Sequence, residues 1–485
     1  MKFFKGLAGQ TVIYGLGTIV PRLLNYLLFT PFYTRIFEVG EYGSFNILYA
    51  CSSLLFVILT FGMETTYFRF SINKEDEQST YNHTFFFTSL FASLFLIALL
   101  IFNNGVSNFM EFDPLYIKCF AFIIFFDVFT SIPFARLRNQ NKALKFSIIK
   151  LINVSVNIFL NIFFFVICRD SDNQTLASFY NPNIGIGYAF ISNVVSSATS
   201  FLLLLPNMIN FQFRFSLSKY RDFLSYSWPV IIIGIGGMIN EVSDKFFIEN
   251  LTPESLDPLR QVGLYSANYK IAVLMSIFIQ MFRYAAEPFF FKKSVNSDAK
   301  QTYREVMNYF SIFCLLIFIG VCVYIDLFKY FISENYWSGL DVVPIVLLAN
   351  MFLGIYYNQS VWYKINNKTK YGAVITLIGA VITIVFNVKL IPLIGFKGSA
   401  IATIACYAVM MIVSYFWGQK VYPIDYDVKR FFLYMTVAIL IVFLRNQFAI
   451  NNLFVSLSIG TALIIFYLAF LYYFERKNIK KLLCK

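Results

Sequence analysis

The chain has 485 residues, of which 58% are hydrophobic, 20% aromatic and 13% charged, and its mean hydropathy is +0.66. A soluble protein of this length could not cover so much apolar surface, so the composition predicts an all-α membrane protein that crosses the bilayer many times. The net charge of +13 does not indicate nucleic-acid binding, because the basic residues stand in short clusters between apolar runs.

Apolar runs of about 20 residues, separated by polar breaks, predict transmembrane helices. The first run is too long for the core of a cleavable signal peptide, so we expect it to stay in the membrane. No loop is long enough to fold as a separate domain. Fourteen spans are predicted, at residues 10–34, 42–66, 84–104, 115–136, 146–168, 184–206, 223–249, 262–289, 306–328, 340–363, 371–391, 397–418, 429–447 and 452–474.

The distribution of basic residues predicts the orientation of the chain, because lysine and arginine are retained on the cytoplasmic side. One set of alternate loops, together with the two ends of the chain, holds 26 of the 39 basic residues, and the opposite set holds seven. Both termini are therefore expected in the cytoplasm, which requires an even number of spans and agrees with fourteen.

An internal repeat divides the spans into two related groups, a common architecture of transporters. The offset is about 223 to 226 residues, and the matches occur in chain order. They predict a first lobe of six helices in residues 1–210 and a second in residues 211–420, with two extra helices and a basic tail in 421–485. The matched pairs include Arg22 with Lys245, Tyr42 with Tyr265, Glu64 with Glu287 and Asn161 with Asn387.

Two cations at matching positions, Arg22 and Lys245, fall deep inside apolar runs. A charge at bilayer depth costs on the order of 3 kcal/mol or more, so such residues indicate a water-filled interior. In one interpretation both line a cavity between the lobes and bind an anionic group of the substrate. In the alternative, Lys245 pairs with Glu241 or Asp244 of its own helix, whereas Arg22 has no acidic neighbour in its helix.

Two further cations, Lys270 and Arg283, are predicted to line the same cavity and contact the substrate. Arg283 also lies four residues before Glu287, a spacing that puts both on one helix face. A stabilising pair between these two side chains is the alternative for Arg283.

Three acidic residues are candidates for coupling transport to a proton or sodium gradient, namely Asp127, Glu241 and Asp244. Buried carboxylates with a raised pKa are used for this purpose in antiporters. Asp127 follows two phenylalanines and would be intolerable in lipid, so we expect it to face the interior. Pairing with Arg22 or Lys270 is the simpler outcome for it.

Polar stripes occur at matching positions of the two lobes. Asn153, Asn157 and Asn161 lie on one face of the fifth helix, and Thr383 and Asn387 share a face of the eleventh. They would suit a hydrated cavity wall that contacts sugar hydroxyls. Hydrogen bonds between helices, worth about 0.6 kcal/mol each, are the alternative.

Motifs for other chemistry are missing from the sequence. The cysteines have no metal-ligand spacing, His83 is the single histidine, and no nucleotide-binding signature is found. We therefore expect no metal and no bound cofactor. An O-antigen polymerase or ligase would need a large outer loop with a catalytic arginine or histidine, which the sequence lacks, so an enzyme is the weaker alternative.

Several sequence blocks resemble the Wzx-type polysaccharide-unit flippases of the multidrug/oligosaccharidyl-lipid/polysaccharide exporter superfamily. The resemblance covers nearly the whole chain. Its blocks are KGLAGQTV at 5–12 followed by Pro21-Arg22, FEVGEYG at 37–43, GMETTYFR at 62–69, RNQNK at 138–142 and GFKGSAIA at 395–402.

This resemblance implies a V-shaped fold of two lobes with a cationic central cavity, in a bacterial cytoplasmic membrane. It implies transfer of undecaprenyl-pyrophosphate-linked oligosaccharide units from the inner to the outer leaflet, for surface polysaccharides such as O-antigen or capsule. Membrane lipids, a polysaccharide polymerase and glycosyltransferases of the same pathway are the expected partners. A cation-coupled multidrug exporter of the same superfamily is the alternative, in which the acidic residues would bind the coupling ion.

Overall fold

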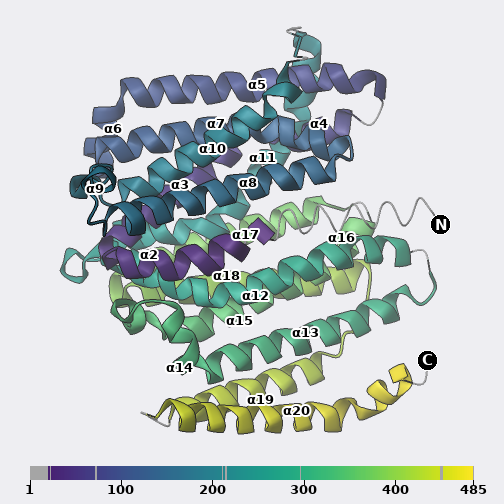
Figure 1. Ribbon diagram of the computed structural model, residues 1–485. Coiled ribbons are helices and arrows are strands. Elements are labelled where there is room, and N and C mark those ends of the chain that lie inside the picture. The colour runs from purple at the N-terminus through teal and green to yellow at the C-terminus, as the bar shows by residue number, and fades with distance from the viewer. Residues whose placement is uncertain are drawn as a thin grey trace. The chain divides into compact units, whose positions relative to one another are not determined.

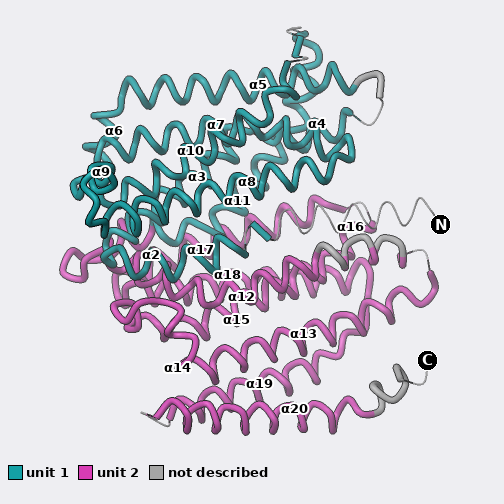
Figure 2. The backbone as a smooth tube through the Cα atoms, viewed as in Figure 1, with its two compact units in different colours: residues 1–246 teal, residues 247–485 magenta. Residues whose placement is uncertain are grey.

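Figure 1 shows the computed structural model of the chain. It describes residues 20–21, 23–71, 74–209, 211–212, 216–294, 296–366, 368–447 and 452–483, with side chains except at 74–76, 284–285, 287–288, 291–292 and 477–483. All regular structure in these ranges is helical. The chain divides into two compact units, residues 1–246 and 247–485, shown in separate colours in Figure 2. Each unit is described below by itself.

Unit 1 is a bundle of long helices joined by short segments. Helix α5 packs on α7, while α7 and α8 both pack on α10. The last helix, α11, crosses the boundary between the units, so that only its residues up to 246 belong here. The elements are η1 (Asn25–Phe29), α2 (Thr30–Ile36), α3 (Val39–Thr60), α4 (Met63–Phe70), α5 (Lys74–Ile101), α6 (Asn103–Met110), α7 (Pro114–Asn139), α8 (Ala143–Ile162), η2 (Phe163–Cys168), α9 (Gln174–Ala177), η3 (Pro182–Ile184), α10 (Gly187–Met208) and α11 (Leu217–Leu251).

The break between the first two predicted spans is tighter than the sequence indicates. Helix α2 ends at Ile36 and α3 begins at Val39, so five of the seven residues of the predicted loop 35–41 are helical. The reason is a capping box: Glu38 accepts from the backbone three residues on, and the Glu41 carboxylate accepts from the Glu38 backbone N–H at 3.0 Å. These bonds satisfy amide groups that would otherwise lack partners at the start of the helix.

The second predicted span is broken near its end. Phe61 and Gly62 both have positive φ angles, of 48° and 69°, and they separate α3 from α4. A Cβ atom on Gly62 would lie 3.2 Å from a methyl carbon of Val230 on α11, so the left-handed turn and the close helix approach both require glycine. The turn changes the direction of the chain between α3 and α4, the helix that carries Glu64.

Unit 2 is a second helical bundle. Helix α18 packs on both α17 and α15, while α12 packs on α15 and α13 packs on α19. Asp257 caps α12, since its carboxylate accepts from the Arg260 backbone N–H at 3.1 Å just ahead of Pro258. The elements are η4 (Glu254–Leu256), α12 (Pro258–Lys293), α13 (Ala299–Val323), α14 (Ile325–Phe328), η5 (Lys329–Phe331), η6 (Glu334–Gly339), α15 (Val342–Gln359), α16 (Val361–Ile365), α17 (Lys370–Ile394), α18 (Phe396–Val421), α19 (Val428–Asn446) and α20 (Leu453–Leu483).

Hydrogen bonds to a buried charged side chain tie each end of the α19–α20 hairpin to its neighbours in unit 2. At one end Arg445, 4% exposed, donates to Asp326 at 2.5 Å and to Ser456 at 2.6 Å. At the other end the buried Glu475 carboxylate accepts from the Tyr434 hydroxyl at 2.7 Å and from Asn308 on α13 at 3.3 Å. The last two helices are therefore fixed to unit 2 by more than apolar contact.

Asp326, which accepts the hydrogen bond from Arg445, lies outside the membrane-spanning helices. Burial raises the pKa of its carboxyl, but hydrogen bonds from Ser456 and Lys329 and the charges of Lys329 and Arg445 outweigh this and hold the pKa below its ordinary value. The carboxylate is thus charged in this network at neutral pH.

Twelve helices among the described residues are long and apolar enough to cross a membrane. This confirms an all-α membrane protein with many spans. Of the fourteen predicted spans, the first, at 10–34, lies mostly outside the described residues, and the thirteenth forms α19, whose ends carry the basic residues Lys429, Arg430 and Arg445. The number fourteen stays a prediction.

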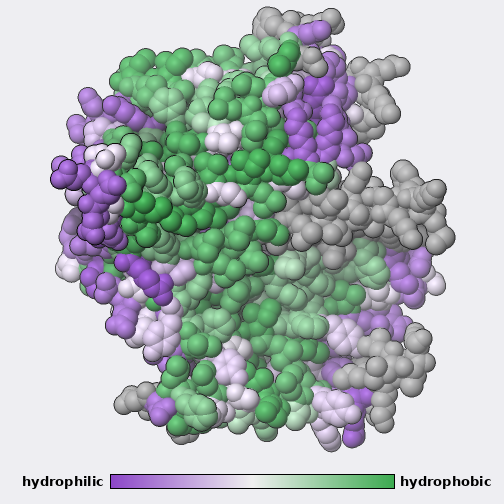
Figure 3. Space-filling view, viewed as in Figure 1, coloured by the Kyte–Doolittle hydropathy of each residue, from purple (hydrophilic) through white to green (hydrophobic). Residues whose placement is uncertain are grey.

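The surface of the protein also indicates helices that cross a membrane. Figure 3 shows hydrophobic side chains along the flanks of the helices, with hydrophilic side chains gathered near helix ends, as around α9. Exposed large apolar residues are numerous on the long helices, for example Leu94, Leu202 and Phe443. Such flanks need a hydrocarbon surrounding rather than water.

Candidate functional site

In unit 1, Asp127 on α7 lies beside a serine and a lysine of neighbouring helices. Its Oδ1 accepts from the Ser197 hydroxyl of α10 at 2.9 Å, and Lys150 of α8 is close enough to interact electrostatically with the carboxylate. The Asp127 side chain is exposed although Ser197 is buried. The carboxylate is therefore open to small ions and has a cation near it.

The asparagine stripe of α8 points into unit 1. Asn153 donates to the Ser196 carbonyl of α10 at 2.8 Å and to the Ser200 hydroxyl at 3.0 Å. Asn161 is buried, donates to the Asn157 side-chain oxygen at 2.8 Å and accepts from the Tyr33 hydroxyl at 2.8 Å. Every member of the stripe is thus bonded to another polar group of this unit.

Lys245, Asp244 and Glu241 stand on α11. Asp244 is buried, and its Oδ1 accepts from the Lys245 ammonium at 3.1 Å and from the Lys245 backbone N–H at 2.9 Å. Glu241 is exposed. The lysine is therefore paired within its own helix, and an anionic ligand would share it with Asp244. Arg22, its match in the repeat, lies outside the described residues.

Charged pairs that the sequence did not single out join three helix ends in unit 1. Arg136 of α7, which is buried, donates to the Glu77 carboxylate of α5 at 3.1 Å and stacks on the Tyr81 ring at 4.1 Å. Arg138 of α7 pairs with Glu64 of α4. These bonds hold α4, α5 and α7 together at the end that is rich in basic residues.

In unit 2, the two predicted cations lie on α12 at different levels. Lys270 is partly buried and Arg283 is exposed. Thirteen residues separate them, which is roughly 20 Å along a helix. A single anionic head group therefore cannot contact both. The Glu287 side chain, the predicted partner of Arg283, lies outside the described residues.

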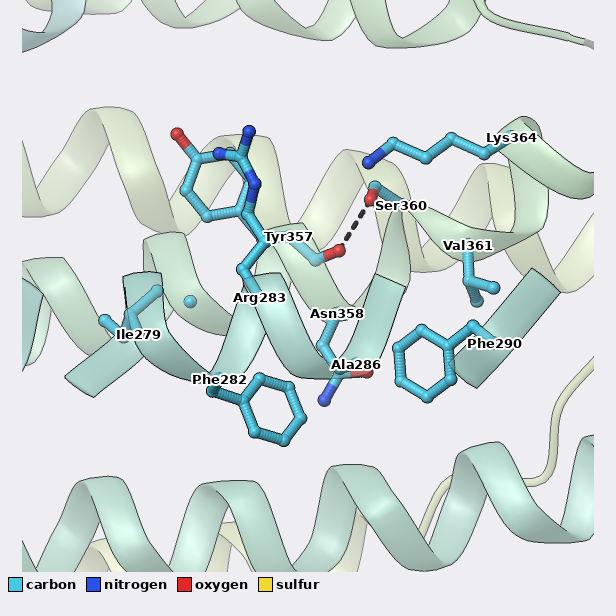
Figure 4. Close-up of a pocket in the computed structure, with 11 residues that line it drawn as sticks. Ile279, Phe282, Arg283, Ala286, Phe290, Tyr357, Asn358, Ser360, Val361 and Lys364 are labelled. Atoms are coloured by element: carbon cyan, nitrogen blue, oxygen red, sulfur yellow. Dashed lines mark hydrogen bonds between the residues drawn. The ribbon is translucent and has the colours of Figure 1, made fainter. Parts of the chain in front are cut away.

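A small, open hollow of about 20 Å³ lies beside Arg283 at the end of α12. Figure 4 shows Arg283 over the Tyr357 ring, with a guanidinium-to-centroid distance of 4.7 Å, and Lys364 extending toward Ser360. Asn358 also lines the hollow. Lys364 is not among the residues that the sequence pattern singled out.

The polar pair of α17 is buried in unit 2. Asn387 is 1% exposed, and its amide nitrogen donates to the Thr383 carbonyl of the same helix at 2.7 Å. Its side-chain oxygen has no hydrogen-bond partner in the described part of the chain. Thr383 and Asn387 thus lie inside the bundle, and one buried acceptor among them is unsatisfied.

Comparison with known proteins assigns this helical chain to a family. Residues 7–294 match the sequence model of a family described as polysaccharide biosynthesis protein. The chain belongs to this polysaccharide biosynthesis family. Lsg locus putative protein 1 of Haemophilus influenzae (strain ATCC 51907 / DSM 11121 / KW20 / Rd) is 22% identical over 419 residues, which cover 82% of this chain and 96% of that protein.

Solved structures share the fold of this family member. The lipid II flippase MurJ in an inward closed conformation superposes with a TM-score of 0.74 at 17% identity, over 96% of this chain and 100% of that chain. A multidrug resistance MATE transporter of the MOP superfamily, in an outward-facing conformation, gives a TM-score of 0.60 at 13% identity, over 85% and 95%. At these identities the likeness shows the fold alone.

The fold and the family match together confirm the Wzx-like resemblance found in the sequence. The protein is a member of the polysaccharide biosynthesis family with a MurJ- and MATE-like fold.

Two features of this polysaccharide biosynthesis protein could not be found by scanning single helices. Lys150 approaches Asp127 because α8 and α7 both pack on α10. Lys364 shares a hollow with Arg283 because α16 follows α15 directly and α15 packs on α12. The only sequence signals were a lysine in line with the asparagine stripe and a basic loop.

Proposed function

We propose that the protein flips undecaprenyl-pyrophosphate-linked oligosaccharide units from the inner to the outer leaflet of a bacterial cytoplasmic membrane, for O-antigen, as in lipopolysaccharide, or for capsule. One observation supports the proposal most strongly. The chain belongs to a polysaccharide biosynthesis family, and it has the fold of a lipid II flippase. In this proposal fourteen helices form two six-helix lobes and an added pair, and both termini are cytoplasmic.

The chemistry of the substrate explains why such a chain needs charged groups inside. A diphosphate-linked sugar would lose its solvation in hydrocarbon, so it does not cross unaided. In our proposal Arg22 and Lys245 hold the diphosphate while the polyprenyl tail stays in lipid. The two lobes then expose the head group to each side in turn. Lys245 shares its charge with Asp244, so Arg22 carries more of the attraction.

The remaining predicted residues have secondary roles in this proposal. Lys270 lies on α12 far from Arg283 and would attract the head group at another depth. The asparagines of α8 and the Thr383–Asn387 pair of α17 would form polar walls. The buried acceptor of Asn387 supports a contact with a hydroxyl donor, such as that of a sugar.

Export of surface glycan in cells that lack the chromosomal copy tests the proposal. Arg22→Ala and Lys245→Ala are each expected to reduce export about tenfold, because one charge-assisted hydrogen bond contributes roughly 1.5–3 kcal/mol. The double variant is expected to abolish export. Arg35→Ala is the matched control, since Arg35 is an exposed arginine thirteen residues further along the chain, and its guanidinium donates to the Pro31 carbonyl of its own helix. Normal export by the double variant, at a normal level of membrane protein, would refute the proposal.

A cation-coupled exporter is the second candidate function, and Asp127 is the observation that favours it. This carboxylate is open to small ions and has Lys150 beside it, and the fold is shared with MATE transporters. Proton or sodium flux in vesicles that depends on an organic cation, with none on lipid-linked sugar, would favour this candidate. We propose that in the flippase the same carboxylate, with Glu241 and Asp244, couples the cycle to H⁺ or Na⁺. A polymerase and glycosyltransferases of the pathway are the proposed partners.

A further inference from the structure

A groove with a cavity volume of about 300 Å³ lies between α18 and α19 in unit 2. These helices follow each other in the chain, but α18 packs on α15 and α17 whereas α19 packs on α13, which leaves space between them. A single water needs only about 10–15 Å³, and ligand pockets commonly measure about 300–1,000 Å³. The groove is therefore large enough for a chain-like ligand.

The walls of the groove are mostly apolar and reach the flank of the bundle. On its inner side, Met307 of α13 and Ile355 of α15 are buried. On its outer side the lining residues Ile412, Phe416 and Phe432 are exposed. Exposed apolar surface of this extent on membrane helices needs hydrocarbon around it. The groove thus opens toward the region that the acyl chains of the bilayer occupy.

One end of the groove carries charges of both signs. Arg304 near the start of α13 and Asp427 just before α19 are the charged residues among the described residues that line it, and Nη2 and Oδ2 of these side chains are 3.7 Å apart. Outside the groove, the exposed Asp425 accepts from Arg304 at 2.7 Å, and Arg430 pairs with Asp427 at 3.0 Å. This end is therefore balanced in charge, which suits a zwitterionic head group better than an anion.

A buried acceptor without a partner lies near the same level. Gln359, the last residue of α15, lines the groove and is 5% exposed, and its side-chain oxygen has no hydrogen-bond partner in the described part of the chain. A Cβ atom on Gly354 would lie 2.7 Å from the Phe310 ring of α13, and α13 and α15 run in opposite directions (Figure 1). Five residues of helix rise roughly 7.5 Å, so Gln359 lies near the level of Arg304. A donor on a ligand would satisfy this oxygen.

The chemistry of this end distinguishes between zwitterionic lipids. A primary ammonium has three N–H donors, whereas the quaternary ammonium of choline has none. A phosphate would accept from Arg304, since a guanidinium has five N–H donors and the exposed contact with Asp425 is weak. The polar end lies at the start of α13 and α19 and near the end of α18, where a head group leaves the hydrocarbon.

We propose that this groove binds one molecule of a bilayer phospholipid with a primary amine, such as phosphatidylethanolamine. The Gln359 oxygen accepts from the ammonium, Arg304 donates to the phosphate, and an acyl chain fills the apolar length between α18 and α19. The proposal does not rest on the proposed function, because this lipid belongs to the bilayer and is not transported.

Native mass spectrometry of the purified full-length protein tests the head group with short-chain phosphatidylethanolamine and with short-chain phosphatidylcholine, the zwitterion without N–H donors. The wild type is expected to bind phosphatidylethanolamine about tenfold more tightly, which corresponds to one hydrogen bond to a charged group. Gln359→Leu should remove this preference and leave the binding of phosphatidylcholine unchanged. Asn358→Leu is the matched control, because Asn358 is also buried but does not line the groove, and it should keep the preference.

Ile412→Trp tests the apolar length in the same assay. The exposed Ile412 lies on the open side of the groove, so a larger ring there takes the place of the acyl chain without entering the buried core. Binding of both lipids should weaken about tenfold or more, because buried apolar surface is lost. Val381→Trp on α17 provides the comparison, since Val381 is exposed and lies outside the groove, and it should bind both lipids as the wild type does.

Three results would overturn the proposal: equal affinity of the wild type for the two lipids, a preference for phosphatidylethanolamine that survives Gln359→Leu, or binding that Ile412→Trp leaves unchanged. Farnesyl diphosphate is the competing probe and is expected to leave phosphatidylethanolamine bound. Displacement of the phospholipid by farnesyl diphosphate at equal concentration would assign the groove to a prenyl chain and would also overturn the proposal.

Discussion

Helix α8 of unit 1 and helix α17 of unit 2 carry polar side chains at matching positions of the repeat, yet they are bonded differently. On α8, Asn153 bonds to α10 and Asn161 receives the Tyr33 hydroxyl of α2. On α17, the Asn387 amide donates to the Thr383 carbonyl of the same helix, and its side-chain oxygen has no partner among the described residues. The matched residues Asn161 and Asn387 therefore differ: the first is bonded across helices, and the second keeps an acceptor without a partner among the described residues.

Unit 2 also has cross-helix polar bonding at the ends of α19 and α20. There Arg445 joins Asp326 and Ser456 across three elements. The comparison suggests a division of roles. Groups that are fully bonded fix helices to one another, whereas the spare oxygen of Asn387 fixes none. Three substitutions test this division.

Arg445→Met is expected to have the largest effect on stability. Removing one partner of a buried ion pair leaves the other charge poorly compensated and costs roughly 3–5 kcal/mol. Asp326 would keep Lys329 at 3.3 Å and Ser456, so we expect the low end, about 3 kcal/mol. The thermal midpoint of the purified protein should fall by several degrees.

An exposed pair of the same unit provides the control. Lys397 and Asp341 are 2.7 Å apart, with side chains 46% and 71% exposed, so Lys397→Ala should change stability by less than about 1 kcal/mol. The pKa of Asp326 is lowered, so its contribution is present above the ordinary aspartate pKa of about 4 and is lost as the pH falls through the lower native value. A stability difference between wild type and Arg445→Met that stayed constant down to pH 2 would contradict this account.

Asn161→Leu is expected to destabilise unit 1 by about 2 kcal/mol. The substitution keeps the shape of the side chain but leaves the buried Tyr33 hydroxyl without its acceptor, and an unsatisfied buried group costs about 1–3 kcal/mol. The measurement is the shift of the unfolding midpoint.

Tyr33→Phe separates this bond from other effects of the substitution. In the Asn161→Leu background it removes the unsatisfied hydroxyl, so the double variant should recover part of the lost stability. If the two single losses simply add, the Tyr33–Asn161 bond does not connect α2 to α8 in the way described.

The sequence was sufficient to predict the helices. It was not sufficient to predict the hydrogen-bond partners of their polar side chains. Apolar length predicted most spans, and the Glu38–Glu41 capping box explains why the first break is shorter than predicted. The periodicity of α8 correctly put its asparagines on one face. Which helix that face meets is decided by packing between segments far apart in the chain, so Ser196, Tyr33 and Lys150 could not be identified as neighbours in advance.

Asn387→Leu is expected to have the smallest effect on stability, within about 1 kcal/mol. It removes one bond within α17, but it also removes the unsatisfied buried oxygen, and these two changes oppose each other. If the spare acceptor serves a ligand, glycan export should fall although the unfolding midpoint is unchanged. Loss of stability comparable to that of Asn161→Leu would instead mean that α17 is bonded as α8 is, and the contrast between the two helices would not hold.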